Sequence, residues 1–202
     1  MCVSSNLRKD LHNSILRLIG QYMYISNPGT IFKLEYFNLK ASRENKGVKV
    51  RADMICDYIK GNNNKTFSGR PPVGMACDVS VVDGYRVQNV VKDNNILKAE
   101  KGKTSKYEKS DLIRNHDYSF IPLIFTSNYR IGDEVKSFLK ALKAKSKSSG
   151  GRVFSISGFM IKVGYLITKY NYMKYCDYVY NLSKYLNGRE MRRIGVDERV
   201  IE

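Results

Sequence analysis

The chain has few of the residues that bind structural metal ions or form disulfides. It has no tryptophan, two histidines and only four cysteines among its 202 residues. The cysteines show no C-x-x-C spacing, and only His12 and His116 are present to complete a ligand set with them. Structural zinc sites need closely grouped Cys and His ligands, so the sequence argues against such a site.

Long apolar runs are also missing. Charged residues and asparagines interrupt every apolar stretch before it reaches the roughly 20 residues of a membrane-spanning helix. No apolar segment typical of a secretory leader occurs near the N-terminus. We therefore expect no membrane segment, reduced thiols, and an intracellular location in the nucleus or the cytoplasm.

Positive charge is what the chain has in excess. It carries 35 Lys and Arg against 19 Asp and Glu, a formal net charge of +16, within a composition that is 43% hydrophobic and typical of a folded protein. Such an excess is the electrostatic signature of a phosphate-binding surface, although many basic proteins merely carry solvated charge. DNA is the partner we expect.

Hydrophobic periodicity and turn residues predict seven elements before a C-terminal extension. In chain order they are a helix (7–23), three strands (30–37, 48–59 and 75–82), a helix (89–107), a strand (118–126) and a helix (132–145). This order, α-β-β-β-α-β-α, predicts an α/β fold with a small mixed central sheet flanked by helices. Pro122 within the last strand predicts an edge position or a bulge.

Composition divides the chain into three parts. Residues 1–146 form the expected core, 147–152 a basic flexible linker, and 153–202 a Tyr-rich, helical extension that packs on the core. Tyrosines of the extension either offer a stacking surface for bases or fill the core and its rim, and packing is the commoner role.

Acidic residues on three successive predicted strands are the first candidates for chemistry. Glu35, Asp53 and Asp78 are placed to converge at one edge of the sheet, where clustered carboxylates repel each other unless a cation lies between them. Carboxylate oxygens favour Mg²⁺ or Mn²⁺, and such an ion activates water for phosphodiester hydrolysis. A lysine on the following helix, Lys103 first and Lys106 second, would stabilise charge on the phosphate.

The same residues also have a purely structural interpretation. Asp53 would then be a strand-end residue, Asp78 would form a buried ion pair with a lysine, and the remaining lysines would be a solvated face. His12 lies one step off the apolar stripe of the first helix, where it is either a boundary residue or points into a site. Residue type alone favours the boundary.

Several short motifs carry a resemblance to a known family. They are Arg51-x-Asp53, Asp78-Val79-Ser80-Val81, Ala99-x-x-x-Lys103-x-x-Lys106-Tyr107, Phe120-x-Pro122 and the stretch from Thr126 to Gly132. In this order the chain resembles the restriction-like endonuclease domain at the C-terminus of reverse transcriptases from site-specific non-LTR retrotransposons, part of the PD-(D/E)xK superfamily. The similarity extends to Leu11-His12-Asn13 and Glu35, and covers roughly residues 7–145.

The resemblance implies a restriction-endonuclease-like core that nicks DNA with Mg²⁺ or Mn²⁺. It implies Asp53 and Asp78 as metal ligands, Glu35 as a helper, and Lys103 or Lys106 as the catalytic lysine. The residues we expect to contact nucleic acid are Arg51, Lys101, Tyr107 and His12. A reverse-transcriptase region would be a natural partner, and it is not part of these 202 residues.

Two positions depart from the superfamily pattern. Ser80 stands where the superfamily lysine is expected, two residues after the second acid and on the same strand face. In the retroelement branch the next helix supplies that lysine, which is where Lys103 and Lys106 lie. Ala52 replaces the proline that usually precedes the first acid.

The sequence is therefore compatible with three functions. The leading hypothesis is a metal-dependent DNA endonuclease. The first alternative is a catalytically inactive nucleic-acid-binding domain on the same fold, which the net charge supports equally well. A Holliday-junction resolvase or repair nuclease of the same superfamily is the third, and cleavage of junction DNA by a symmetric dimer would favour it.

Overall fold

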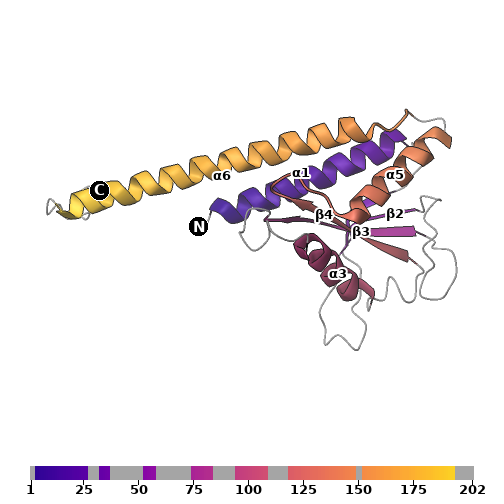
Figure 1. Cartoon of the computed structure of the whole chain (residues 1–202), viewed down its shortest axis with the longest axis horizontal. Coiled ribbons are helices and arrows are strands. Elements are labelled where there is room, and N and C mark those ends of the chain that lie inside the picture. The colour runs from indigo at the N-terminus through magenta and orange to yellow at the C-terminus, as the bar shows by residue number, and fades with distance from the viewer. Residues whose placement is uncertain are drawn as a thin grey trace.

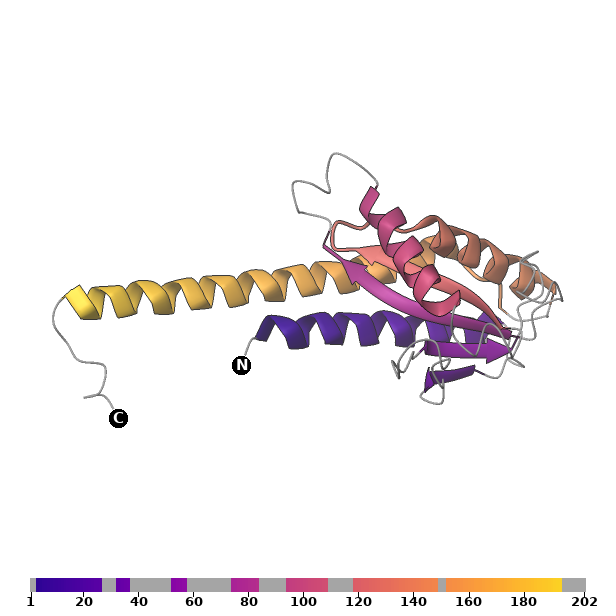
Figure 2. The same cartoon turned by 90° about the horizontal axis from the view of Figure 1, so that it is seen from below.

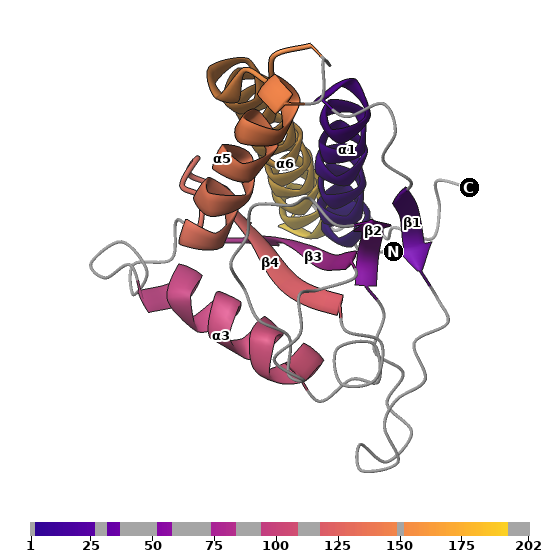
Figure 3. The same cartoon turned by 90° about the vertical axis from the view of Figure 1, so that its right-hand side faces the viewer.

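The described part of the chain is a four-stranded sheet with helices on both faces (Figures 1 and 3). The computed structural model describes residues 3–26, 32–36, 52–57, 74–83, 94–108, 118–148 and 152–193. Three helices lie on one side of the sheet: α1 (Val3–Ser26), α5 (Asp133–Ser148) and α6 (Ile156–Arg193). Helix α3 (Asn94–Glu108) lies on the other side.

The sheet is mixed and its strand order follows the sequence. Its strands, in the order β1-β2-β3-β4, are β1 (Phe32–Tyr36), β2 (Ala52–Asp57), β3 (Gly74–Val82) and β4 (Tyr118–Thr126). The first two pairs are antiparallel, whereas β3 and β4 are parallel and joined through α3. The predicted α/β order is confirmed, with helix and strand ends shifted by a few residues from those expected.

Pro122 lies on an edge strand, as its missing N–H requires. Among the described strands β4 pairs only with β3, and the β3–β4 register runs without a break from Gly74↔Tyr118 to Val82↔Thr126. The proline is opposite Asp78 in this register. Of the two predicted explanations for the proline, the edge position is confirmed and no bulge interrupts the pairing.

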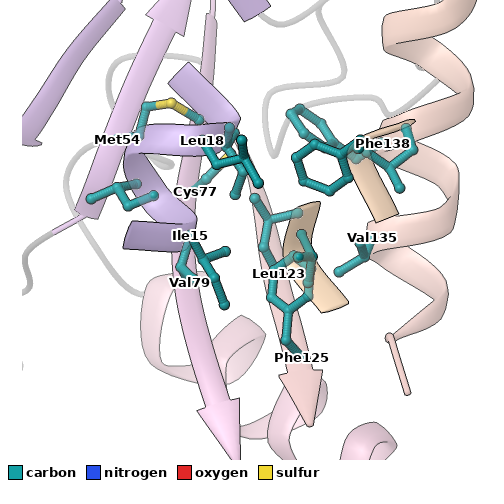
Figure 4. Close-up of a cluster of buried hydrophobic side chains, with 14 of the residues drawn as sticks. Ile15, Leu18, Met54, Cys77, Val79, Leu123, Phe125, Val135 and Phe138 are labelled. Carbon is teal, nitrogen blue, oxygen red and sulfur yellow. The ribbon is translucent and has the colours of Figure 1, made fainter. Parts of the chain in front are cut away.

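The main hydrophobic core lies between the sheet and the three-helix layer (Figure 4). The apolar stripes of α1 and α5 are both buried there, because each repeats at helical spacing and faces the sheet. Strand side chains of alternate positions meet them, among them Cys77 and Val79 of β3. The fully buried centre includes Ile15, Ile19, Met54, Leu123, Phe125, Leu139 and Leu142.

A smaller cluster occupies the opposite face, beneath α3. Ala52, Ile55 and Ala76 of the sheet contact the ring of Tyr107, which is fully buried. That ring stacks on Phe120 of β4 with centroids 4.0 Å apart and planes 11° from parallel. Helix α3 is therefore held to the sheet mainly by one aromatic side chain near its C-terminal end.

The N-terminus of α5 is capped by a side chain from another helix. Glu100 of α3 accepts a hydrogen bond from the Glu134 N–H at 3.3 Å, satisfying one of the donors that a helix N-terminus leaves unpaired. Burial raises the pKa of the Glu100 carboxyl group. Gly132 permits this approach, because a Cβ there would lie 2.9 Å from Glu100 Cδ.

Helix α6 packs on the core with only its N-terminal half. Phe159, Val163 and Ile167 are buried, and Tyr22 of α1 contacts Phe159 edge-on with centroids 5.3 Å apart. Beyond them α6 continues past the N-terminal end of α1 (Figures 1 and 2). The expectation that the Tyr-rich extension packs on the core is wrong for its tyrosines at 165, 172, 175, 178, 180 and 185, which are all more than half exposed.

Two further observations concern thiols and membranes. Cys56, Cys77 and Cys176 are in no disulfide in the described part of the chain, the first two being buried and the third exposed. Burial raises the pKa of the Cys77 thiol well above its usual range. Among the described helices, none combines the length and apolar character needed to cross a bilayer.

The unequal packing of α6 predicts unequal responses to truncation. Ile167→Ala removes a side chain that is 1% exposed and should lower the free energy of unfolding by about 2–5 kcal/mol. Leu182→Ala, on the same helix but at a position 42% exposed, should change it by less than about 0.5 kcal/mol in the monomer. Urea unfolding of both variants, at a protein concentration low enough to keep the chain monomeric, measures the difference. Equal losses would contradict this packing.

Candidate functional site

Asp78 lies in the middle of β3 and is paired at both carboxylate oxygens. Its side chain is 8% exposed, so its charge is largely removed from water. Lys103 Nζ lies 2.7 Å from Oδ1, and the Tyr107 hydroxyl donates to Oδ2 at 2.7 Å. Both partners come from α3, four residues apart and therefore on one face of that helix. Their bonds explain how an acid is tolerated in an apolar strand.

Asp53 approaches the same segment of β3 from β2. Its Oδ2 accepts a hydrogen bond from the Val79 N–H at 2.7 Å, directly beside Asp78 in the chain. The ladder between β2 and β3 includes Met54↔Cys77, the pair that adjoins both aspartates along their strands. The side chain of Asp53 thus supplies the acceptor for Val79, and the two aspartates come together at the centre of the sheet.

His12 of α1 completes this group. Its Nε2 lies 2.9 Å from Asp53 Oδ2, and its Nδ1 lies 3.2 Å from Asn13 Oδ1. The hydrogen bond to Asp53 raises the pKa of His12 above 6.5, with a smaller contribution in the same direction from the charge of Asp78 and an opposing one from burial. A protonated His12 is thereby favoured next to the carboxylate.

We refer to His12, Asp53, Asp78, Lys103 and Tyr107 as the carboxylate site. It draws one helix from each side of the sheet, because α1 and α3 lie on opposite faces (Figure 3). Each carboxylate has its own basic partner, His12 beside Asp53 and Lys103 beside Asp78. This pairing offsets the repulsion expected between two acids in one place.

A basic pocket opens next to the site at the C-terminal end of β3. It has a volume of about 410 Å³ and is lined by Arg8, Lys9, His12 and residues 79–82. Arg8 is fixed there by donating a hydrogen bond to the Val81 carbonyl oxygen at 2.7 Å. The pocket therefore offers cationic side chains within reach of the His12–Asp53 pair, an arrangement suited to an anionic ligand such as phosphate.

The structure brings some of the expected site residues together and leaves others apart. Lys103 contacts Asp78, whereas Lys106 is exposed and holds its ammonium 5.5 Å from the Tyr107 ring centroid. Lys101 is exposed on α3, and Ser80 lines the basic pocket. The expectations for Arg51 and for the Glu35 side chain lie outside the described residues.

These contacts correct one expectation and decide another. Tyr107 was expected to contact nucleic acid, but its ring is fully buried under α3 and its hydroxyl is bonded to Asp78. His12 was left open between a boundary residue and one that points into a site, and its ring points at Asp53, 41 residues away in the chain. The one sequence signal for His12 was the ordered motif that begins with Leu11, because helical periodicity is silent on what an off-stripe residue contacts.

The site offers carboxylate oxygens, which suit a divalent metal ion, but it offers few of them. Two carboxylates are a sufficient protein share for Mg²⁺, which usually keeps several waters and shares substrate phosphate oxygens. Among the residues that the structure describes, no group of three or more His, Cys, Asp and Glu side chains is placed to hold a metal ion. Lys103 also occupies the Asp78 oxygen that a metal would use, so metal binding requires this ammonium to move.

No protein-family model and no curated protein matches this sequence. The interpretation of the carboxylate site therefore depends on its own geometry and charges.

The His12–Asp53 pair predicts a measurable pH dependence. NMR titration should give His12 a pKa above 6.5 in the wild type and a lower one in Asp53→Asn, because the hydrogen bond to the carboxylate is the main cause of the shift. The raised pKa stabilises the folded state fully below the ordinary pKa and loses this effect as pH rises through the folded-state value. The stability difference between wild type and His12→Gln should therefore shrink with rising pH. An unchanged His12 titration in Asp53→Asn would contradict the pairing.

Proposed function

We propose that this chain is a metal-dependent DNA endonuclease with a restriction-endonuclease-like core. The observation that carries the proposal is that Asp53, Asp78 and Lys103 come from β2, β3 and the following helix and meet at one place. Two carboxylates with one lysine form the minimal set for metal-dependent phosphodiester hydrolysis. The basic pocket beside them and the net charge of +16 support a polyanionic substrate.

Each residue of the carboxylate site has a defined part in the proposed reaction. Asp53 and Asp78 would hold Mg²⁺ or Mn²⁺, which when bound supplies an activated water and stabilises charge on the phosphate. Lys103, displaced from Asp78, keeps its ammonium at the site and balances the negative charge that develops in the transition state. Tyr107 orients the Asp78 carboxylate, and His12 orients that of Asp53.

The phosphate backbone would enter from the basic pocket. Arg8 and Lys9 of α1 line that pocket, and so does Ser80 of β3. Backbone contacts of this kind place a nucleic acid without reading its sequence. This part of the proposal includes the kinship with the endonuclease domains of non-LTR retrotransposon reverse transcriptases, whose lysine also comes from the helix after the second acid.

Nicking of supercoiled plasmid DNA in Mg²⁺ tests the proposal, and two lysines of α3 offer a matched pair. Lys103→Met should lower the nicking rate by roughly 100-fold, because it removes the charge nearest the carboxylates. Lys106→Met, three residues further along the same helix, should retain the rate within about threefold, because its side chain is exposed and makes no contact with the aspartates.

Asp78→Asn is the decisive variant for catalysis. It keeps the size of the side chain but removes the charge that a metal would need, so nicking should be abolished while circular dichroism remains that of the folded protein. A well-folded wild type without activity, or an Asp78→Asn variant as active as wild type, would refute the endonuclease proposal.

A catalytically inactive DNA-binding domain is the second candidate, and one observation favours it. Both Asp78 oxygens are already bonded to Lys103 and Tyr107, so the site is electrostatically satisfied with no metal required. Calorimetric titration with Mn²⁺ distinguishes the two functions. An endonuclease should bind Mn²⁺ through Asp53 and Asp78, whereas a binding-only domain should bind DNA with a strong salt dependence and take up no Mn²⁺ at this site.

A further inference from the structure

We infer that the exposed face of α6 is a dimerisation surface for a second copy of this chain. The inference is independent of the proposed nuclease activity, because it concerns a helix face that lies away from the carboxylate site. The two parts of helix α6 differ in how far their side chains are buried. Residues 159–167 bury one stripe against α1 and the core, whereas residues 172–186 have no buried side chain although many are large and apolar.

Seven of the eleven large exposed apolar residues of α6, together with Thr168, follow an alternation of four and three residues. In the heptad notation abcdefg, the a positions are Tyr165, Tyr172, Val179 and Leu186. The d positions are Ile161, Thr168, Tyr175 and Leu182. A repeat of 3.5 residues sustained over this length is the pattern of a coiled-coil seam rather than of a helix packed on a globular core. We call these eight residues the α6 seam.

The α6 seam contacts its own domain through Thr168, whose hydroxyl lies 3.1 Å from the Tyr129 hydroxyl. Its apolar members are instead all exposed: Ile161 is 73% exposed, Tyr172 67% and Leu186 53%. The helical angle between the seam and the buried stripe of Phe159, Val163 and Ile167 is about 150°, at 100° per residue. Helix α6 thus has two apolar faces, one covered by the core and one left uncovered, and it extends beyond every other described element (Figure 2).

The uncovered part of the helix needs a partner for its stability. Helical stability in proteins comes mostly from packing of an apolar face, and isolated helices of this length are marginal in water. In the described chain, the seam residues Tyr172, Tyr175, Val179, Leu182 and Leu186 are all exposed. The seam side chains of two copies expose on the order of 1,000 Å² together, near the lower end of specific interfaces.

Charge identifies the occupant as a second copy rather than an acidic helix or a nucleic acid. Positions that flank the seam on one side are uncharged: Gly164, Asn171, Tyr178 and Tyr185. On the other side they include two lysines, Lys162 and Lys169, both in the half near the domain. An acidic helix or a phosphate backbone binds to a row of cationic side chains, and the positions that flank the far half of the seam carry none. An identical uncharged seam can pack against this half with the knobs-into-holes geometry of a coiled coil.

Sedimentation equilibrium of nuclease-treated full-length chain tests the inference, with two double variants as a matched pair. Tyr172→Glu with Val179→Glu places two charges in the seam at a positions seven residues apart. Met173→Glu with Tyr180→Glu places two charges one residue further along, at b positions that are also exposed and seven residues apart. The seam variant should weaken dimerisation at least about 100-fold and the control variant less than about threefold.

The salt dependence separates an apolar seam from a nucleic-acid bridge. Two domains of charge +16 repel each other, so dimerisation through the seam should strengthen as salt screens this repulsion. A dimer bridged by residual nucleic acid would weaken with salt instead. Circular dichroism of both variants establishes that they are folded. A wild type that stays monomeric up to about 100 µM, well above the Kd of typical specific interfaces, or equal behaviour of the two variants, would overturn the inference.

Discussion

The structure depends on one buried charge, the carboxylate of Asp78 at the centre of β3. An ionised carboxylate removed from water costs several kcal/mol unless it is compensated, and among the described residues both of its bonded partners come from α3. Lys103 supplies the opposite charge and Tyr107 a hydroxyl, while the Tyr107 ring is the main apolar anchor of that helix. Docking of α3 and neutralisation of Asp78 are therefore one event, because neither is favourable without the other.

Asp53 extends the same logic to the other side of the sheet. By accepting from the Val79 N–H it ties β2 to β3, and by pairing with His12 it ties both strands to α1. The sheet is thus bound to its two helical layers by a short polar network as well as by the hydrophobic clusters above and below. This network holds two carboxylates and their basic partners in a fixed geometry at the centre of the fold.

Helix α6 separates two tasks along its length. Its N-terminal half contributes Phe159, Val163 and Ile167 to the core, so it belongs to the folding unit that presents the carboxylate site. Residues 172–186 add no buried side chain to that core and carry most of the α6 seam away from the sheet (Figure 1). The boundary between these two parts lies inside a continuous helix, near residue 170. Composition instead predicts a boundary at a flexible linker, residues 147–152.

The sequence by itself determined the order of the elements and the buried stripes of α1 and α5, and it limited Pro122 to an edge or a bulge. Periodicity and proline chemistry are local properties, and residues four apart on α3 share a face in any fold. Only the tertiary structure decided that His12 meets Asp53, that Tyr107 is buried and that the tyrosines of α6 are not. Those outcomes depend on which apolar faces are buried in the core and which polar groups are removed from water. Packing between segments far apart in the chain decides both.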